Sequence, residues 1–114
     1  MREKLKDKER LNHIIESIDN ISEFVRGKSF DTFRNDKILR FAIIKNIEII
    51  GEAAYLLSEE FRTMHNEIEW KDLIGMRHIL VHDYYQIKFE IVWVTIEEDL
   101  HPLREKIIKL INEE

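Results

Sequence analysis

The sequence predicts an all-α fold, an antiparallel bundle of four main helices joined by short connecting helical turns. The 114 residues include three Gly and one Pro, while 44% are apolar and 36% are charged. So few chain-breaking residues beside so many charged ones are typical of long amphipathic helices. Apolar residues also recur at three- and four-residue steps along most of the chain, which is the helical period.

The first helix is predicted to end near Arg26. Arg26 places a cation in the last turn, and Gly27 can adopt the left-handed conformation that often ends a helix. Ser29 and Asp31 then begin a short connection. The apolar stripe of the first helix consists of Leu11, Ile14, Ile15, Ile18, Ile21 and Val25.

The second helix, about Asp36 to Leu57, is the most apolar part of the chain, and Asn35 or Asp36 is a suitable N-cap. Its apolar stripe is wide, which predicts contacts on more than one side of the helix. We therefore place it at the centre of the bundle, where it can also serve a dimer interface. Ser58 is expected to cap a short turn over residues 59–64.

The third helix is predicted from Trp70 to Val81, with Asp72 in the first turn, where a negative charge interacts favourably with the helix dipole. Residues 83–86 interrupt the pattern. The last helix runs from about Lys88 to Ile111 and keeps its apolar phase. Pro102 lies inside it and removes one backbone hydrogen bond, so we expect a kink there.

Two glycines, Gly51 and Gly75, lie inside predicted helices, where each costs ~1 kcal/mol relative to Ala. Close helix–helix approach is the expected reason for both. The alternative for Gly75 is that it makes room for a ligand backbone beside Arg77.

Composition excludes several kinds of protein. The formal charge of −5 argues against a broad basic face for polyanions, and the absence of Cys excludes disulfides and thiolate sites. Neither a signal peptide nor a membrane-spanning apolar run is evident. We expect one cytoplasmic domain over residues 1–114.

The charged residues near the N-terminus are expected to form a solvated helix face. They are Arg2, Glu3, Lys4, Lys6, Asp7, Lys8, Glu9 and Arg10.

The densest polar chemistry lies between Arg77 and Tyr85. Arg77 and His82 are five positions apart, ~140° around a regular helix, so they cannot share one face. Two arrangements remain. Either the helix ends near His82 and its ring turns back, or Arg77 and His82 of two copies meet across a dimer axis.

These side chains suit the cleavage of an RNA phosphodiester bond. The reaction needs a base for the 2′-hydroxyl proton, a cation for the charge on the phosphorane, and an acid for the leaving oxygen. His and Arg supply these functions without a metal. The spacing alone is common by chance and identifies no nuclease.

The same residues form a family motif. Arg77, His82 and Tyr84 resemble the Arg-x4-His-x-Tyr motif of the HepT-like toxins, within the HEPN superfamily of ribonucleases. Residues 50–54, 70–77, 90–93 and 98–100 also resemble that family, so the likeness covers nearly the whole chain.

The resemblance implies a helical homodimer that is a metal-independent endoribonuclease without a cofactor. It implies that Arg77 stabilises the phosphorane charge, that His82 is the general base or acid, and that both protomers line one cleft. His78 is then a supporting residue. The implied partners are RNA and a minimal nucleotidyltransferase (MNT) antitoxin, which neutralises the toxin by transferring AMP to Tyr84.

Several alternatives stay open beside this interpretation. Glu52 either faces and orients Arg77 or is a solvated carboxylate. His78 and His82 have a spacing that two metal ligands can use, but no third ligand beyond Asp83 is near in sequence, so no metal site is predicted. The alternative function is a non-catalytic helical subunit that binds a nucleotidyltransferase and assists its choice of substrate.

The remaining aromatic residues near the motif are interpreted as packing residues. They are Tyr85, Trp70 and Trp93.

Overall fold

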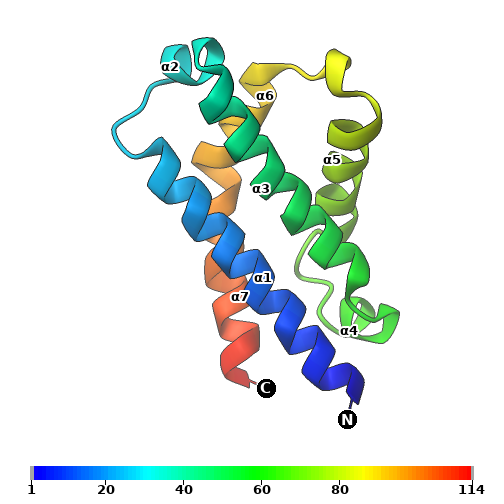
Figure 1. Cartoon of the computed structure of the whole chain (residues 1–114). Coiled ribbons are helices and arrows are strands. Elements are labelled where there is room, and N and C mark those ends of the chain that lie inside the picture. Colours follow the sequence, from blue (N-terminus) through cyan, green and yellow to red (C-terminus); the bar gives the residue numbers. More distant parts are fainter. Residues whose placement is uncertain (1, 114) are drawn as a thin grey trace.

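A computed structural model of the chain describes the backbone of residues 2–113 and the side chains of residues 6–113. The described part is all-α and contains no strand. Its main helices are α1 (Arg2–Val25), α3 (Lys37–Leu56), α5 (Trp70–His82) and α7 (Leu100–Glu113), with α6 (Phe89–Val94) leading into α7. These helices run alternately up and down, and the two ends of the chain lie at the same end of the bundle (Figure 1). The predicted fold class is confirmed.

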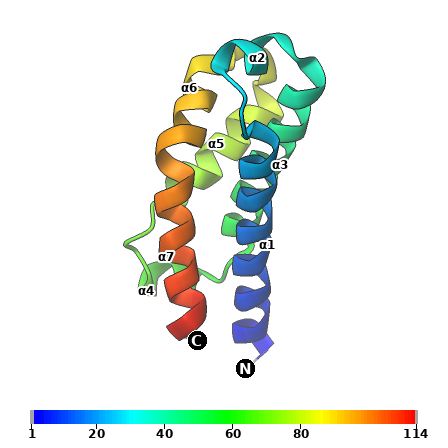
Figure 2. The same ribbon diagram turned by 90° about the vertical axis from the view of Figure 1, so that its left-hand side faces the viewer.

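The core lies where α1, α3 and α7 meet, and α5 packs on another side of α3 (Figures 1 and 2). The stripe predicted for the first helix is confirmed, because its central members Leu11, Ile14, Ile18 and Ile21 are buried. Helix α3 contacts both α1 and α5, as its wide apolar surface predicts. The buried residues of α3 are Ile43, Ile44, Asn46, Ile47, Ile50, Gly51, Ala53 and Ala54.

The helix ends follow local capping chemistry. Asp36 caps α3 by accepting a hydrogen bond from Leu39 N–H at 3.0 Å, and Ser58 accepts one from Phe61 N–H at 3.1 Å at the start of α4 (Glu59–Met64). Gly27 has φ 70°, the left-handed conformation predicted for the end of the first helix.

The short connection predicted after Gly27 contains a short helix, α2 (Phe30–Asn35). Ser29 caps it by accepting a hydrogen bond from Thr32 N–H at 3.2 Å. Phe33 anchors it, since this ring is fully buried with its centroid 5.4 Å from that of Trp93 on α6. The packing role predicted for Trp93 is confirmed.

The last helix is interrupted by a wide π-helical turn, η2 (Thr95–Asp99), in which Leu100 N–H bonds to Thr95 C=O. This irregularity comes just before Pro102, which lies inside α7. Proline has no N–H to offer to the carbonyl of Glu98, four residues earlier. The irregular segment is therefore the π turn ahead of the proline, and α7 itself continues as α-helix through Pro102.

The prediction of a solvated N-terminal helix face is wrong at Asp7. Its carboxylate is buried and accepts two hydrogen bonds, from Ser58 N–H and Ser58 Oγ–H, both at 2.8 Å. Lys6, Lys8 and Glu9 are exposed as expected. The side chains of Arg2, Glu3 and Lys4 lie outside the described residues.

On the bundle surface, Arg104 Nε on α7 donates a hydrogen bond to Asp19 Oδ1 on α1 at 2.7 Å. This hydrogen bond and the charge of Asp19 hold the pKa of the Arg104 guanidinium above its ordinary value. None of the described helices is long and apolar enough to cross a membrane.

Candidate functional site

Helix α5 carries the motif and is fixed at both ends. The indole N–H of Trp70 donates to the backbone carbonyl of His65 at 3.0 Å, and the Trp70 side chain is buried, which confirms its packing role. At the other end Asp83 N–H bonds to Ile79 C=O at 2.8 Å. The helix ends at His82, and a 3₁₀ turn, η1 (Tyr84–Gln86), follows. Arg77, His78 and His82 are thus held on one rigid element.

Arg77 is placed by close contact between α5 and α3. A Cβ built on Gly51 would lie 2.3 Å from Arg77 Cβ and 2.6 Å from the carbonyl oxygen of Leu73. The glycine therefore permits an approach that any side chain would prevent. Arg77 is half-buried, so its stem is held against α3. The close approach predicted for Gly51 is confirmed.

His78 and His82 lie together on the exposed side of the last turn of α5. Their ring centroids are 4.6 Å apart, with 48° between the ring planes. Both are exposed.

The chain does not bring Arg77 and His82 into contact. The helix does end at His82, but the His82 ring turns toward His78 and not toward Arg77. Among the described side chains no ion pair joins Glu52 to Arg77, and Glu52 is exposed. The arrangement in which the His82 ring turns back to Arg77 is therefore not present in this chain.

Tyr84 lies directly beyond the helix and packs on α3. Its half-buried ring is stacked on Phe41, with centroids 5.8 Å apart and an interplanar angle of 16°. Tyr85 is completely exposed, with an edge-to-face contact to Tyr84 at 5.7 Å. The prediction that Tyr85 is a packing residue is wrong, because the 3₁₀ turn points successive side chains in different directions.

Gly75 differs from Gly51. A Cβ at Gly75 would meet nothing within 4 Å, so the close approach expected there is absent within one chain. Two exposed apolar side chains, Ile79 and Val81, lie on the same helix and are 46% and 42% exposed. This part of α5 is an open surface that a ligand or a second protein molecule can approach.

No group of three or more potential His, Asp or Glu metal ligands occurs among the described side chains. His78 and His82 are a pair only.

The sequence analysis did not identify one residue beside the motif, Phe41. Phe41 lies in the long apolar run of α3, and its 47% exposure is not evident from that run.

Known proteins resemble this chain over most of its length. A family model described as "Ribonuclease HepT-like" matches residues 14–110, which include Arg77, His82 and Tyr84. The chain is 39% identical over 103 residues to "Probable ribonuclease HepT" of Thermococcus cleftensis, covering 90% of this chain and 94% of that protein.

Two further relatives carry related names. A "Putative RNase" of Caldanaerobacter subterraneus subsp. tengcongensis is 36% identical over 104 residues, which are 91% of this chain and 93% of the relative. A "Gamma-glutamylcyclotransferase and putative RNase" of Methanocaldococcus jannaschii is 42% identical over 103 residues, and there 90% of this chain spans 46% of the relative. No solved structure gives a significant match. The chain belongs to the HepT-like ribonuclease family.

Proposed function

We propose that this protein is a metal-independent endoribonuclease, active as a homodimer, and the toxin of a toxin–antitoxin pair. The observation that carries the proposal is the match to the HepT-like ribonuclease family across residues 14–110, with Arg77, His82 and Tyr84 in the family's motif. The exposed imidazoles at the end of α5 support it, because His exchanges protons near neutral pH.

The reaction is an intramolecular transfer within RNA. One imidazole, assigned to His82, takes the proton of a 2′-hydroxyl, and the oxygen attacks the adjacent phosphorus. The bond from phosphorus to the 5′-oxygen breaks, and an imidazolium returns a proton to that oxygen. The products are a 2′,3′-cyclic phosphate and a 5′-hydroxyl. Arg77 stabilises the added charge on the phosphorane, and His78 supports the His82 ring that it contacts.

A homodimer explains why the site is divided within one chain. Arg77 and His82 point in different directions on α5, so two copies are needed to place a guanidinium and an imidazole on one phosphate. The open surface at Gly75 and the exposed Ile79, one helical turn later on the same face of α5, support contact between two α5 helices. In a two-fold dimer each residue is presented twice, once from each protomer.

The aromatic rings beyond His82 support a single-stranded substrate. Tyr85 is fully exposed, and the Phe41–Tyr84 stack lies beside it. Unpaired bases stack on such rings with little sequence preference. Lys45 is exposed one helical turn after Phe41, where its ammonium can meet a phosphate.

The proposed antitoxin is a minimal nucleotidyltransferase that modifies Tyr84. The phenolic oxygen attacks the α-phosphorus of ATP, pyrophosphate leaves, and the phenol proton passes to a base. The AMP group then adds a negatively charged phosphate at Tyr84, just beyond the end of α5, and repels the RNA.

Cleavage of a labelled single-stranded RNA in the presence of EDTA tests the nuclease. The wild type should yield a 2′,3′-cyclic phosphate, and Arg77→Ala or His82→Ala should lower the rate by about 10²–10⁴-fold. Arg26→Ala and His101→Ala, which change exposed residues outside α5, are the matched controls. Undiminished cleavage by both site variants would overturn the proposal. Complete absence of cleavage by the wild type on any RNA would favour the non-catalytic subunit instead.

Mass spectrometry after co-expression with a nucleotidyltransferase encoded by a neighbouring gene tests the modification. The expected result is one or more AMP groups that are lost in Tyr84→Phe and retained in Tyr85→Phe. If Tyr84→Phe is still neutralised fully, inhibition proceeds by another route.

A further inference from the structure

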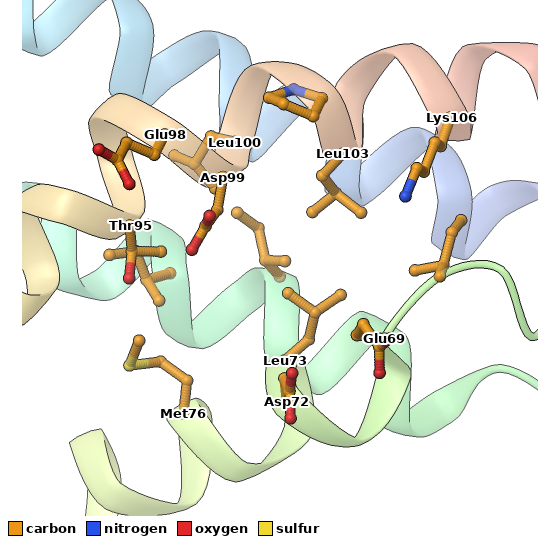
Figure 3. A pocket seen from close by; sticks show the side chains of 14 residues that line it. Glu69, Asp72, Leu73, Met76, Thr95, Glu98, Asp99, Leu100, Leu103 and Lys106 are labelled. Atoms are coloured by element: carbon orange, nitrogen blue, oxygen red, sulfur yellow. The ribbon is translucent and has the colours of Figure 1, made fainter.

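An apolar groove lies between α5 and α7, away from the histidine pair. It has a volume of about 370 Å³, and α3 forms its base (Figure 3). Its apolar lining includes Ile47, Ile50, Leu73, Met76, Leu100 and Leu103. We call this feature the α5–α7 groove.

The groove has an acidic edge. Glu69 and Asp72 lie on the α5 side, and Glu98 and Asp99 lie on the opposite side, in the π turn (Figure 3). All four are exposed, and none forms an ion pair with another described side chain.

One cation, Lys106, is among the described residues that line the groove. Its ammonium donates to the backbone carbonyl of Glu67 at 3.4 Å, which turns it toward one end. The long sides of the groove are therefore negative, with unneutralised carboxylates.

The dimensions fit a helical segment. The groove follows α5 from Glu69 to Met76 and the last helical run from Thr95 to Lys106. At 1.5 Å rise per residue these walls are roughly 10 and 16 Å long, or two to three turns of a bound helix. An amphipathic helix binds such a groove with its apolar face inward. The π turn in one wall fits this assignment, because π turns are frequent at functional sites.

The groove is separate from the histidine pair. Met76 and His78 are two positions apart, so they point in nearly opposite directions, ~200° apart around α5. RNA is a poor occupant, because the carboxylates repel phosphates. A second copy of this chain is also a poor match, since its formal charge is −5.

We propose that the α5–α7 groove binds a basic amphipathic helix of a different protein. Apolar side chains of that helix contact Leu73, Met76 and Leu103, and its Lys or Arg residues pair with the carboxylates at the two edges. The inference does not depend on the nuclease activity, because it concerns binding on another face of α5.

A designed peptide tests the proposal on the full chain. The probe is an 18-residue helix of Leu, Ala and Lys with one apolar stripe, and its controls replace every Lys by Glu or by Gln. Calorimetry measures affinity, and ¹³C-methyl NMR of methionine locates the contact. Met76 lines the groove, whereas Met64 lies exposed on α4 and is an internal reference.

The expected result is binding of the Lys peptide with a shift of the Met76 methyl signal and none at Met64. The double variant Glu98→Lys, Asp99→Lys should weaken binding about tenfold or more. The matched variant Glu16→Lys, Glu23→Lys makes the same charge change on the exposed side of α1 and should weaken it about twofold at most.

Four outcomes would overturn the proposal. One is equal binding of the Lys and Gln peptides, which would indicate an uncharged occupant. Another is an unchanged Met76 signal, or equal weakening by both double variants, which would indicate non-specific attraction to an acidic surface. The last is loss of self-association in Glu98→Lys, Asp99→Lys during sedimentation, which would assign the groove to a second copy. RNA cleavage by the same variants is measured separately, so failure here and failure of the nuclease proposal are distinguishable.

Discussion

Gly51 on α3 lies directly against the stem of Arg77 on α5, so close that a methyl group at Gly51 would be 2.3 Å from Arg77 Cβ. The absence of one side chain on α3 thus fixes the depth at which α5 packs. It also sets the position of Arg77 Cβ, from which the side chain extends to its guanidinium. The glycine is part of the site although it has no functional group.

Gly51→Ala should therefore impair both folding and cleavage. The added methyl meets the backbone oxygen of Leu73 as well as Arg77, and a backbone atom cannot move aside cheaply. We expect the free energy of unfolding to fall by about 1–3 kcal/mol, as for other overpacked sites. Urea unfolding measures this loss, and the cleavage rate at a temperature where the variant is folded measures the displacement of Arg77.

Gly75→Ala is the matched control, because a Cβ there meets nothing within 4 Å. Removing a helix-interior glycine should raise the free energy of unfolding by about 1 kcal/mol. A Gly51→Ala variant as stable as wild type would contradict the close contact of α3 and α5.

Mixing of inactive variants should restore activity if the site combines two protomers. A dimer of one Arg77→Ala chain and one His82→Ala chain keeps one intact pair, with Arg77 and His82 from different chains. Random mixing makes half of the dimers mixed, each with one of two sites, so roughly a quarter of the wild-type rate is expected. The measurement is RNA cleavage after the two variants are unfolded and refolded together. No recovery, with mixed dimers verified by mass spectrometry, would show that one chain supplies both groups.

Tyr85→Ala should weaken the binding of single-stranded RNA. The ring is fully exposed and lies beside the Phe41–Tyr84 stack, so its loss removes a surface on which a base stacks. Stacking of a base on an aromatic ring contributes about 1–3 kcal/mol, and we expect the Kd to rise about tenfold. Fluorescence anisotropy with a labelled oligonucleotide measures it. Tyr55→Ala removes another exposed tyrosine, on α3 outside the motif region, and should leave the Kd unchanged. An equal rise in Kd for both variants would contradict a specific stacking role of Tyr85.

Asp7→Ala should destabilise the fold without changing the rate of RNA cleavage by the folded protein. The buried carboxylate accepts two hydrogen bonds from Ser58, and its removal leaves these donors without a partner. A cost of about 1–3 kcal/mol is expected in urea unfolding. Glu9→Ala changes an exposed neighbour and should remain within about 0.5 kcal/mol of wild type. A similar effect of both substitutions would contradict the specific role of Asp7.

The helices were predictable from sequence because their signals are local. The apolar period identifies the stripe of α1, and the caps Asp36 and Ser58 use side chains three positions from their partners. Helix α2 was not predictable in this way, because it is stabilised by burial of Phe33 against Trp93, sixty positions away. Asp7 was misinterpreted for the same reason, since its partner Ser58 is 51 positions distant.

The sequence predicts candidate site residues but not what surrounds them in the fold. The motif spacing identifies Arg77, His82 and Tyr84, and the helical angle correctly separates the first two. The exposure of Tyr85 and the difference between Gly51 and Gly75 depend on which neighbouring element lies opposite each residue. The 3₁₀ turn after α5 sets the first and the packing of α5 on α3 sets the second, and no local pattern encodes either.

The acidity of the chain predicts a weak dependence of RNA affinity on salt. With a formal charge of −5, attraction over a long stretch of RNA is unavailable, and binding depends on a few local cations. If Arg77 of each protomer meets one phosphate, the slope of log K against log salt should be roughly −1 to −2, since each contact with a single strand contributes about −0.7. Titrations of inactive His82→Ala with a labelled RNA between 50 and 300 mM salt, roughly the range over which such slopes are linear, measure it. Arg77→Ala should flatten the slope, because it removes those contacts. A slope steeper than about −4 would require many phosphate contacts and would contradict a narrow site at the dimer axis.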